Sequence, residues 1–119
     1  MPPNNGQLDL VYLEEMSAGD SQFLQELLST YVETATDLIK SIEFAAEEGA
    51  TEKAIYSTHT LKGSSRSIGA EPMGELCQAM EQAARQGNMP LFIQLSRGIP
   101  AMFSKLRGEI DMLLLNRAA

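Results

Sequence analysis

The stretch Asp20–Glu48, DSQFLQELLSTYVETATDLIKSIEFAAEE, decides the fold because its apolar residues repeat at the spacing of an α-helix. They step alternately by four and three positions, as Leu24, Leu28, Tyr31, Ala35, Leu38, Ile42 and Ala45. This spacing is typical of the seam of an antiparallel helical bundle. Asp20 is suited to cap the first turn, and Gly49 is suited to end the helix in a left-handed conformation. We therefore predict one long helix over about residues 20–48.

Helical spacing continues on both sides of this segment, and no segment alternates as a strand would. Further helices are expected over about residues 8–16, 51–68, 72–86 and 90–115. Thr51 is suited to cap the third helix, and Pro72 to open the fourth. Pro100 has no N–H to donate, so a kink or break is expected near it. The pattern predicts an all-α fold: an antiparallel up-and-down four-helix bundle with a short additional N-terminal helix, forming one domain over residues 1–119.

The composition fits an acidic globular domain. Apolar residues make up 44% of the 119 residues and charged residues 21%, which is ordinary globular usage. Nine basic residues stand against 16 acidic ones, and a net charge of −7 disfavours binding to nucleic acid or to an anionic membrane. Cys77 is the single cysteine, which favours a small core residue. Without a signal peptide or an apolar run of about 18 residues, the chain is expected in the cytoplasm.

The segment THTLKGSS contains the single histidine, His59. Helical geometry turns Leu61 toward the core and His59 outward. Four residues share the outward side with the histidine: Glu52, Lys62, Gly63 and Arg66. An exposed histidine is by itself usually only a solvated side chain. However, glycine within a helix costs about 1 kcal/mol relative to alanine, so Gly63 indicates a surface that another protein approaches closely. A neutral imidazole is a nucleophile, and Lys62 and Arg66 add cations for an anion held on it.

Several other chemistries lack the residues that they need. Di-iron bundles need Glu-x-x-His twice, but Tyr56 stands three positions before His59 and the sequence has no second histidine. A zinc site lacks a set of nitrogen and sulfur ligands. The sequence also lacks a Gly-x-Ser-x-Gly elbow, a Walker loop and a kinase glycine-rich loop. We therefore expect no metal, no cofactor and no ATP site in this chain, so a phosphoryl group on His59 would come from elsewhere.

The run His59–Ser65, HTLKGSS, followed by Ile68-Gly69-Ala70 and Leu76-Cys77, resembles the signature of histidine phosphotransfer (HPt) domains, the intermediates of multistep phosphorelays. Two upstream segments, DLVYLEE at 9–15 and GDSQFL at 19–24, are similar to the opening of many members. The resemblance implies that the histidine takes a phosphoryl group from the aspartyl phosphate of a receiver domain and passes it to another response-regulator receiver. It also implies a hybrid sensor histidine kinase as a partner, Mg²⁺ supplied by the receiver, and no autokinase activity.

The resemblance assigns roles to further positions of the sequence. Lys62 would neutralise phosphate charge, Gly63 would permit close approach, and Ser64 would hydrogen-bond near the imidazole or the phosphate. Glu81 matches the position at which family members often have glutamine or glutamate beside the histidine. Its carboxylate would orient the ring through Nδ1, and a solvated surface glutamate is the alternative.

Some features stay open at this point. Tyr12, Met16 and Phe23 are interpreted as core residues, with an apolar docking rim as the alternative. Thr58 departs from the small apolar residue that commonly precedes the histidine in the family. Gly98 interrupts a last helix that is normally continuous in the family.

The sequence is compatible with four interpretations of function. We favour a monomeric, free-standing phosphotransfer protein, because the sequence begins at Met1 and has no kinase domain. An output module excised from a hybrid sensor kinase is the nearest alternative. A non-catalytic helical adaptor would bind receivers or other signalling proteins without relaying phosphate. A self-phosphorylating kinase fragment is disfavoured because no nucleotide-binding segment is present.

Overall fold

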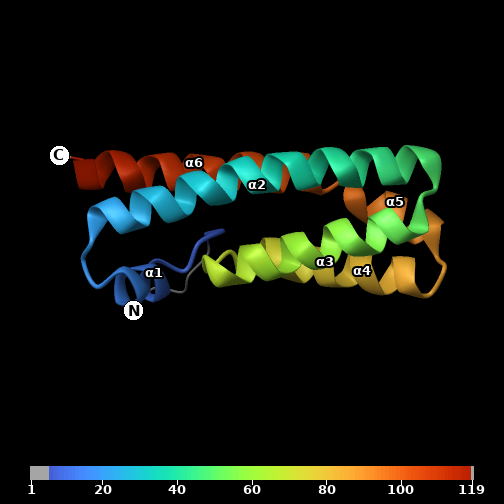
Figure 1. The fold of residues 1–119 in the computed structure, drawn as a ribbon, viewed down its shortest axis with the longest axis horizontal. Helices are drawn as coiled ribbons and strands as arrows, with labels where there is room; N and C mark the ends of the chain where they lie inside the picture. The colour runs from blue at the N-terminus through green and yellow to red at the C-terminus, as the bar shows by residue number, and fades with distance from the viewer. Residues whose placement is uncertain (1–5, 119) are drawn as a thin grey trace.

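The computed structural model describes residues 6–118, which are almost entirely helical and contain no strand (Figure 1). The helices are α1 (Leu10–Ser17), α2 (Ser21–Glu48), α3 (Thr51–Ser67), α4 (Glu71–Arg85), α5 (Met89–Ser96) and α6 (Ile99–Ala118). The predicted all-α four-helix bundle with a short additional N-terminal helix is confirmed. The predicted domain also includes residues 1–5 and 119, which lie outside the described residues.

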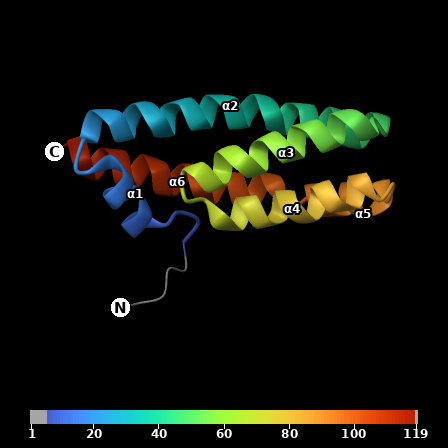
Figure 2. The ribbon, with the colours of Figure 1, turned by 60° about the horizontal axis from the view of Figure 1, so that its bottom comes forward.

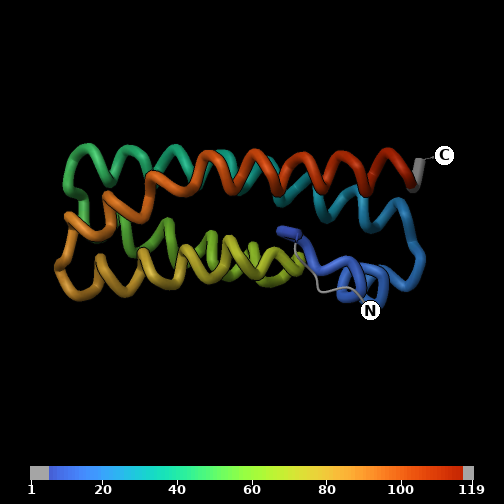
Figure 3. Tube along the Cα trace, turned by 180° about the vertical axis from the view of Figure 1, so that it is seen from behind, coloured from blue at the N-terminus to red at the C-terminus, as the bar shows by residue number. Residues whose placement is uncertain are grey.

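The bundle consists of α2, α3, α4 and the consecutive pair α5 and α6. Each long helix packs against the next one along the chain, and α6 returns to lie along α2 (Figure 1). The view turned by 60° separates α2 from α6 and shows α3 and α4 as neighbours (Figure 2). From behind, α5 leads from the end of α4 into α6 (Figure 3). Because α3 and α4 are shorter than α2, the small helix α1 fits beside the turn that joins them (Figures 1 and 2).

Helix ends follow the predicted capping chemistry at α2 but not at α3. The carboxylate of Asp20 accepts a hydrogen bond from the backbone N–H of Phe23 at 3.0 Å, and Gly49 has a φ of 66°. The expectation that Thr51 caps α3 was wrong. Ala50 occupies the N-cap position without a side-chain bond, and Thr51 is already helical. The backbone itself makes the turn here, because the N–H of Ala50 bonds to the carbonyl of Ala45 at 3.0 Å.

The buried seam of α2 departs from the predicted one at a single position. Leu38 is only half-buried, and Ile39 is buried instead. Leu38 nevertheless packs against the core as a partly buried side chain. The other predicted seam residues of α2 are buried.

The fourth long segment is broken, as the proline near its middle predicts. α5 ends at Ser96 and α6 begins at Ile99, so Pro100 falls in the first helical turn, where a missing N–H costs little. Phe92 on α5 and Leu106 on α6 are both fully buried, so both parts contribute to one core. Within the described residues, no helix combines the length and the apolar character needed to cross a membrane.

Candidate functional site

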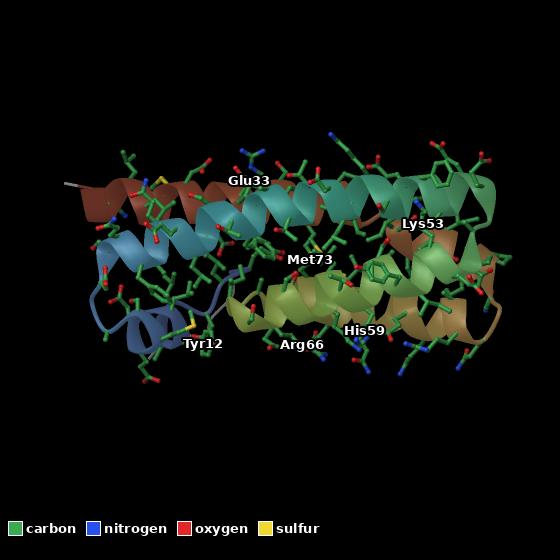
Figure 4. All side chains as sticks on the ribbon, in the orientation of Figure 1. Tyr12, Glu33, Lys53, His59, Arg66 and Met73 are labelled. Carbon is green, nitrogen blue, oxygen red and sulfur yellow. The ribbon has the colours of Figure 1, made fainter. Side chains whose placement is uncertain are left out.

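His59 lies on the side of α3 that faces away from the core. Its side chain is 61% exposed, and Figure 4 shows it on the side of α3 turned away from α2. The opposite side of this helix carries buried hydroxyls. The Thr58 hydroxyl donates to the carbonyl of Ala54 in the same helix at 2.7 Å, and the Ser65 hydroxyl lies 2.8 Å from that of Tyr31 on α2. These polar groups are therefore satisfied inside the core, and the contact between Ser65 and Tyr31 joins α3 to α2.

Glu81 of α4 provides a carboxylate beneath the imidazole. Its Oε2 atom lies 3.1 Å from Nδ1 of His59, and its Oε1 atom lies 2.7 Å from Nζ of Lys62. Arg85, one turn further along α4, places its Nε 2.9 Å and an Nη atom 2.8 Å from the same Oε2. The Glu81 side chain is only 7% exposed, whereas the side chains of His59 and Arg85 are 61% and 55% exposed, so the carboxylate is buried while two of its partners reach the surface. The alternative of a solvated surface glutamate is therefore wrong.

The surroundings of Glu81 keep its carboxylate ionised. Burial would raise the pKa of this group, but hydrogen bonds from Lys62, Arg85 and His59 outweigh it and lower the pKa from 4.5 to about 2. An ionised carboxylate only accepts hydrogen bonds, so the network assigns the proton of a neutral imidazole to Nδ1. The other ring nitrogen, Nε2, then keeps its lone pair free. The exposed side of His59 is thus arranged as a nucleophile.

The surface beside the imidazole is open at Gly63. A side-chain Cβ built at this glycine would meet no atom within 4 Å, and the residue is exposed. Gly63 therefore has no packing reason within the described residues to be glycine. Lys62, by contrast, is half-buried with its ammonium group on Glu81. It can contact an anion on the imidazole only by leaving or sharing that carboxylate.

Comparison with known families agrees with this arrangement. The family model described as Hpt domain matches residues 26–109, which is more than half of the chain and includes the site. The chain belongs to the Hpt domain family. Hpt domains are the histidine phosphotransfer modules of phosphorelays, they interact with receiver domains, and they lack a kinase or ATP site of their own. In the other two comparisons, no curated protein and no solved structure matches the chain.

Two predicted residues of this Hpt domain lie outside the network around Glu81. The Ser64 hydroxyl donates to the carbonyls of Thr60 and Leu61, at 3.1 and 3.3 Å. Its hydrogen bonds are therefore made within its own helix. Arg66 lies one turn beyond Lys62 on the same side as His59 (Figure 4). Its Nε is 3.9 Å from a carboxylate oxygen of Glu71. Neither side chain makes a contact with the imidazole or with Glu81 in the described structure.

The sequence interpretation did not include Arg85. The signal was present, because a glutamate and an arginine four positions apart on a helix lie next to each other. It became significant only once Glu81 was known to be buried beneath the histidine. Many i, i+4 pairs on helices are solvent-exposed and contribute little.

A second surface of the Hpt domain lies at α1. The backbone N–H of Asp9 bonds to the carbonyl of Gly69 at 2.9 Å, and the Tyr12 hydroxyl bonds to the carbonyl of Ser67 at 3.0 Å. These contacts attach α1 to the end of the helix that carries the histidine. The core interpretation was wrong for Tyr12 and Phe23, which are both exposed, while Met16 is half-buried. We define three of the exposed apolar residues of α1 and of the start of α2 as the α1 rim: Val11, Tyr12 and Phe23.

The one cysteine does not contribute to the site. Cys77 is fully buried, and burial is the main reason that its pKa is raised to about 12. A thiol with so high a pKa is a poor nucleophile. Among the described residues, no three histidine, cysteine or acidic side chains are grouped so that they could hold a metal ion.

Proposed function

We propose that His59 accepts a phosphoryl group on Nε2 from the aspartyl phosphate of a receiver domain and passes it to the aspartate of another response-regulator receiver. The observation that supports this most is the hydrogen bond of Nδ1 to Glu81. This bond places the ring proton on the buried side and the free lone pair on the exposed side. The open surface at Gly63 lies one turn away, where a receiver has to come close.

The proposed step needs no proton to leave the attacking nitrogen. The Nε2 lone pair attacks phosphorus, the N–P bond forms, and the P–O bond to the aspartate breaks with its electrons passing to the carboxylate. The ring keeps its Nδ1 proton and gains positive charge, which the ionised Glu81 stabilises at 3.1 Å. The second transfer is the same exchange in reverse, onto a new aspartate.

The remaining chemistry is assigned to the partners. The receiver would supply Mg²⁺ and the groups that stabilise the phosphoryl group in transit, so this chain contributes a positioned nucleophile and a docking surface. Lys62 would turn from Glu81 toward the phosphoryl oxygens. Docking would use Gly63 and the α1 rim. We further propose a hybrid sensor histidine kinase as the upstream source, a monomeric state and a cytoplasmic location.

A transfer assay tests this proposal. The protein is mixed with phosphorylated receivers and Mg²⁺, and label that is labile in acid but stable in alkali is followed on the chain. We expect label on the wild-type protein and none on His59→Gln. Lys40→Gln, an exposed change on α2, serves as the control that should keep full labelling. Binding of receivers without any label would favour the adaptor interpretation, and undiminished label on His59→Gln would exclude the proposed acceptor.

A further inference from the structure

Two cations share the carboxylate that orients the histidine, and they do so from different helices. Lys62 comes from α3 and contacts Oε1, whereas Arg85 comes from α4 and contacts Oε2. The atom that receives the Nδ1 proton of His59 is therefore the one that Arg85 holds. Arg85 makes this contact with two nitrogens, and it is on the same helix as Glu81. Movement of α3 or of the Lys62 side chain leaves that contact in place.

The proposed transfer would affect Lys62 and Arg85 differently. A phosphoryl group on Nε2 adds negative charge to the exposed face, and Lys62 is the cation on the helix of the histidine that would turn to it. Glu81 would then lose its Oε1 partner while remaining almost completely buried. Without Arg85, the buried carboxylate would then have no cation and would take up a proton or rotate toward water. Either change would break the hydrogen bond from Nδ1 to Glu81 during the transfer, when that bond would stabilise the charged ring.

We infer that Arg85 is a positioning residue that keeps the Glu81 carboxylate ionised and directed at Nδ1, so that the imidazole remains in the Nδ1–H tautomer while Lys62 turns to the phosphoryl group. The importance of this for transfer rests on the proposed function. The effect on the tautomer does not, because it concerns the protein before any phosphate arrives. Arg66, the other arginine near the site, is directed to Glu71 and Gly74 and cannot substitute.

The single histidine makes the tautomer directly measurable. In ¹⁵N NMR spectra at about pH 8.5, where an imidazole is neutral, the two ring nitrogens of His59 report which one carries the proton. We expect the Nδ1–H form to dominate in the wild type and in Lys62→Gln. In Arg85→Gln its share should fall toward the Nε2–H form that neutral histidine prefers in water, and Arg85→Lys should restore part of it. The double variant Lys62→Gln/Arg85→Gln should lose the preference altogether.

Reactivity provides the second readout, again without a receiver. Phosphoramidate, a small phosphoryl donor, should label Arg85→Gln about fivefold more slowly than the wild type, because the outer partner of a reacting group tunes its basicity. Arg107→Gln on α6 removes the same charge from an exposed position and should keep the wild-type tautomer and rate. Thermal melts of both variants show whether the fold persists.

Clear results would overturn the inference. If Arg85→Gln keeps both the wild-type tautomer and the wild-type rate, Arg85 does not position the carboxylate. If Lys62→Gln alone shifts the tautomer, Lys62 is the positioning residue instead. Failure of the wild type to receive phosphate from any receiver would count against the proposed function, but it would leave the tautomer measurement intact.

Discussion

The Nδ1 atom of His59 lies 3.1 Å from Oε2 of Glu81, although the two residues are 22 positions apart and belong to different helices. The contact joins an exposed imidazole to a carboxylate that is only 7% exposed. The carboxylate is thus protected from water and salt, while the imidazole is not. The packing of α3 against α4 makes this pairing, so the orientation of the imidazole depends on the bundle itself.

Removing the charge of Glu81 should slow phosphorylation of His59. Glutamine has the same shape, but its amide can donate as well as accept, so it no longer fixes the proton on Nδ1. We expect Glu81→Gln to lower the rate constant for labelling by phosphoramidate by about tenfold. Glu75→Gln, an exposed change on the same helix, is the matched control and should react like the wild type. Equal rates for both variants would remove the orienting role of the carboxylate.

The stability of the protein should depend on pH through the same residue. The pKa of Glu81 is lowered from 4.5 to about 2, since hydrogen bonds from Lys62, Arg85 and His59 outweigh desolvation by burial. A lowered pKa stabilises the folded state fully above the unfolded value, and this contribution is lost as the pH falls toward the folded value. The shift corresponds to about 3 kcal/mol at neutral pH.

Urea unfolding of the wild type and Glu81→Gln checks this contribution. The wild type should be more stable than the variant by about 3 kcal/mol near pH 7, and the difference should shrink between about pH 5 and pH 2. Toward the acid end Glu81 takes up its proton in the folded state as well and then resembles glutamine, so the two proteins should converge. Parallel curves, with a constant difference at all these pH values, would show that the ionised carboxylate is not what stabilises this region.

Sequence patterns were sufficient for the fold because helical spacing and helix punctuation are local properties. The interruption near Pro100 and the outward position of His59 both followed from such local rules. Capping of α3 did not follow, because Ala50 is held by a backbone bond to Ala45 rather than by a side chain. The exchange of Leu38 for Ile39 in the core depends on how the other helices pack around α2, which a repeat within one helix does not contain.

The site could be predicted less completely from the sequence than the fold. His59, Lys62 and Gly63 are close in sequence and share one side of a helix, so their grouping was predictable. The burial of Glu81 was not predictable, since it depends on how α4 packs against α3. The contact of Arg85 with the site could be recognised only after Glu81 had been placed. Tyr12 and Phe23 were misjudged because apolar side chains are usually buried, whereas these two are exposed on α1 and at the start of α2.

The hydrogen bond between Tyr31 and Ser65 should stabilise the packing of α3 on α2. Both hydroxyls are buried and 2.8 Å apart, and burial is the main reason that the pKa of Tyr31 is raised to about 12. Tyr31→Phe and Ser65→Ala should each lower the free energy of unfolding by about 1–2 kcal/mol, because each leaves the other hydroxyl unpaired. The double variant should lose less than the sum, by about 1 kcal/mol. Strict additivity in urea unfolding would mean that the pair does not interact.

The α1 rim should contribute to receiver binding. Phe23 and Phe44 are matched phenylalanines of α2 at opposite ends, 43% and 48% exposed. Phe23→Ser should weaken binding of a transferring receiver about tenfold, as expected for an apolar contact within an interface, and Phe44→Ser should not. Neither change should alter stability by more than about 0.5 kcal/mol. Calorimetric titration measures both affinities, and equal values for the two variants would place the rim outside the interface.

A side chain at position 63 should block the receiver without harming the protein. Gly63 and Gly108 are both exposed helical glycines at which a Cβ would meet no atom within 4 Å. Replacing either with glutamine should stabilise its helix by up to about 1 kcal/mol, because glycine is a poor helix former. Only Gly63→Gln should slow transfer from a phosphorylated receiver, by about tenfold or more, while labelling by the small donor phosphoramidate stays within about twofold of wild type. This separation of the two donors would identify obstruction of docking as the cause. If instead Gly63→Gln and Gly108→Gln accept phosphate from the receiver equally fast, no partner approaches the backbone at Gly63, and the helix tolerates glycine there for some other reason.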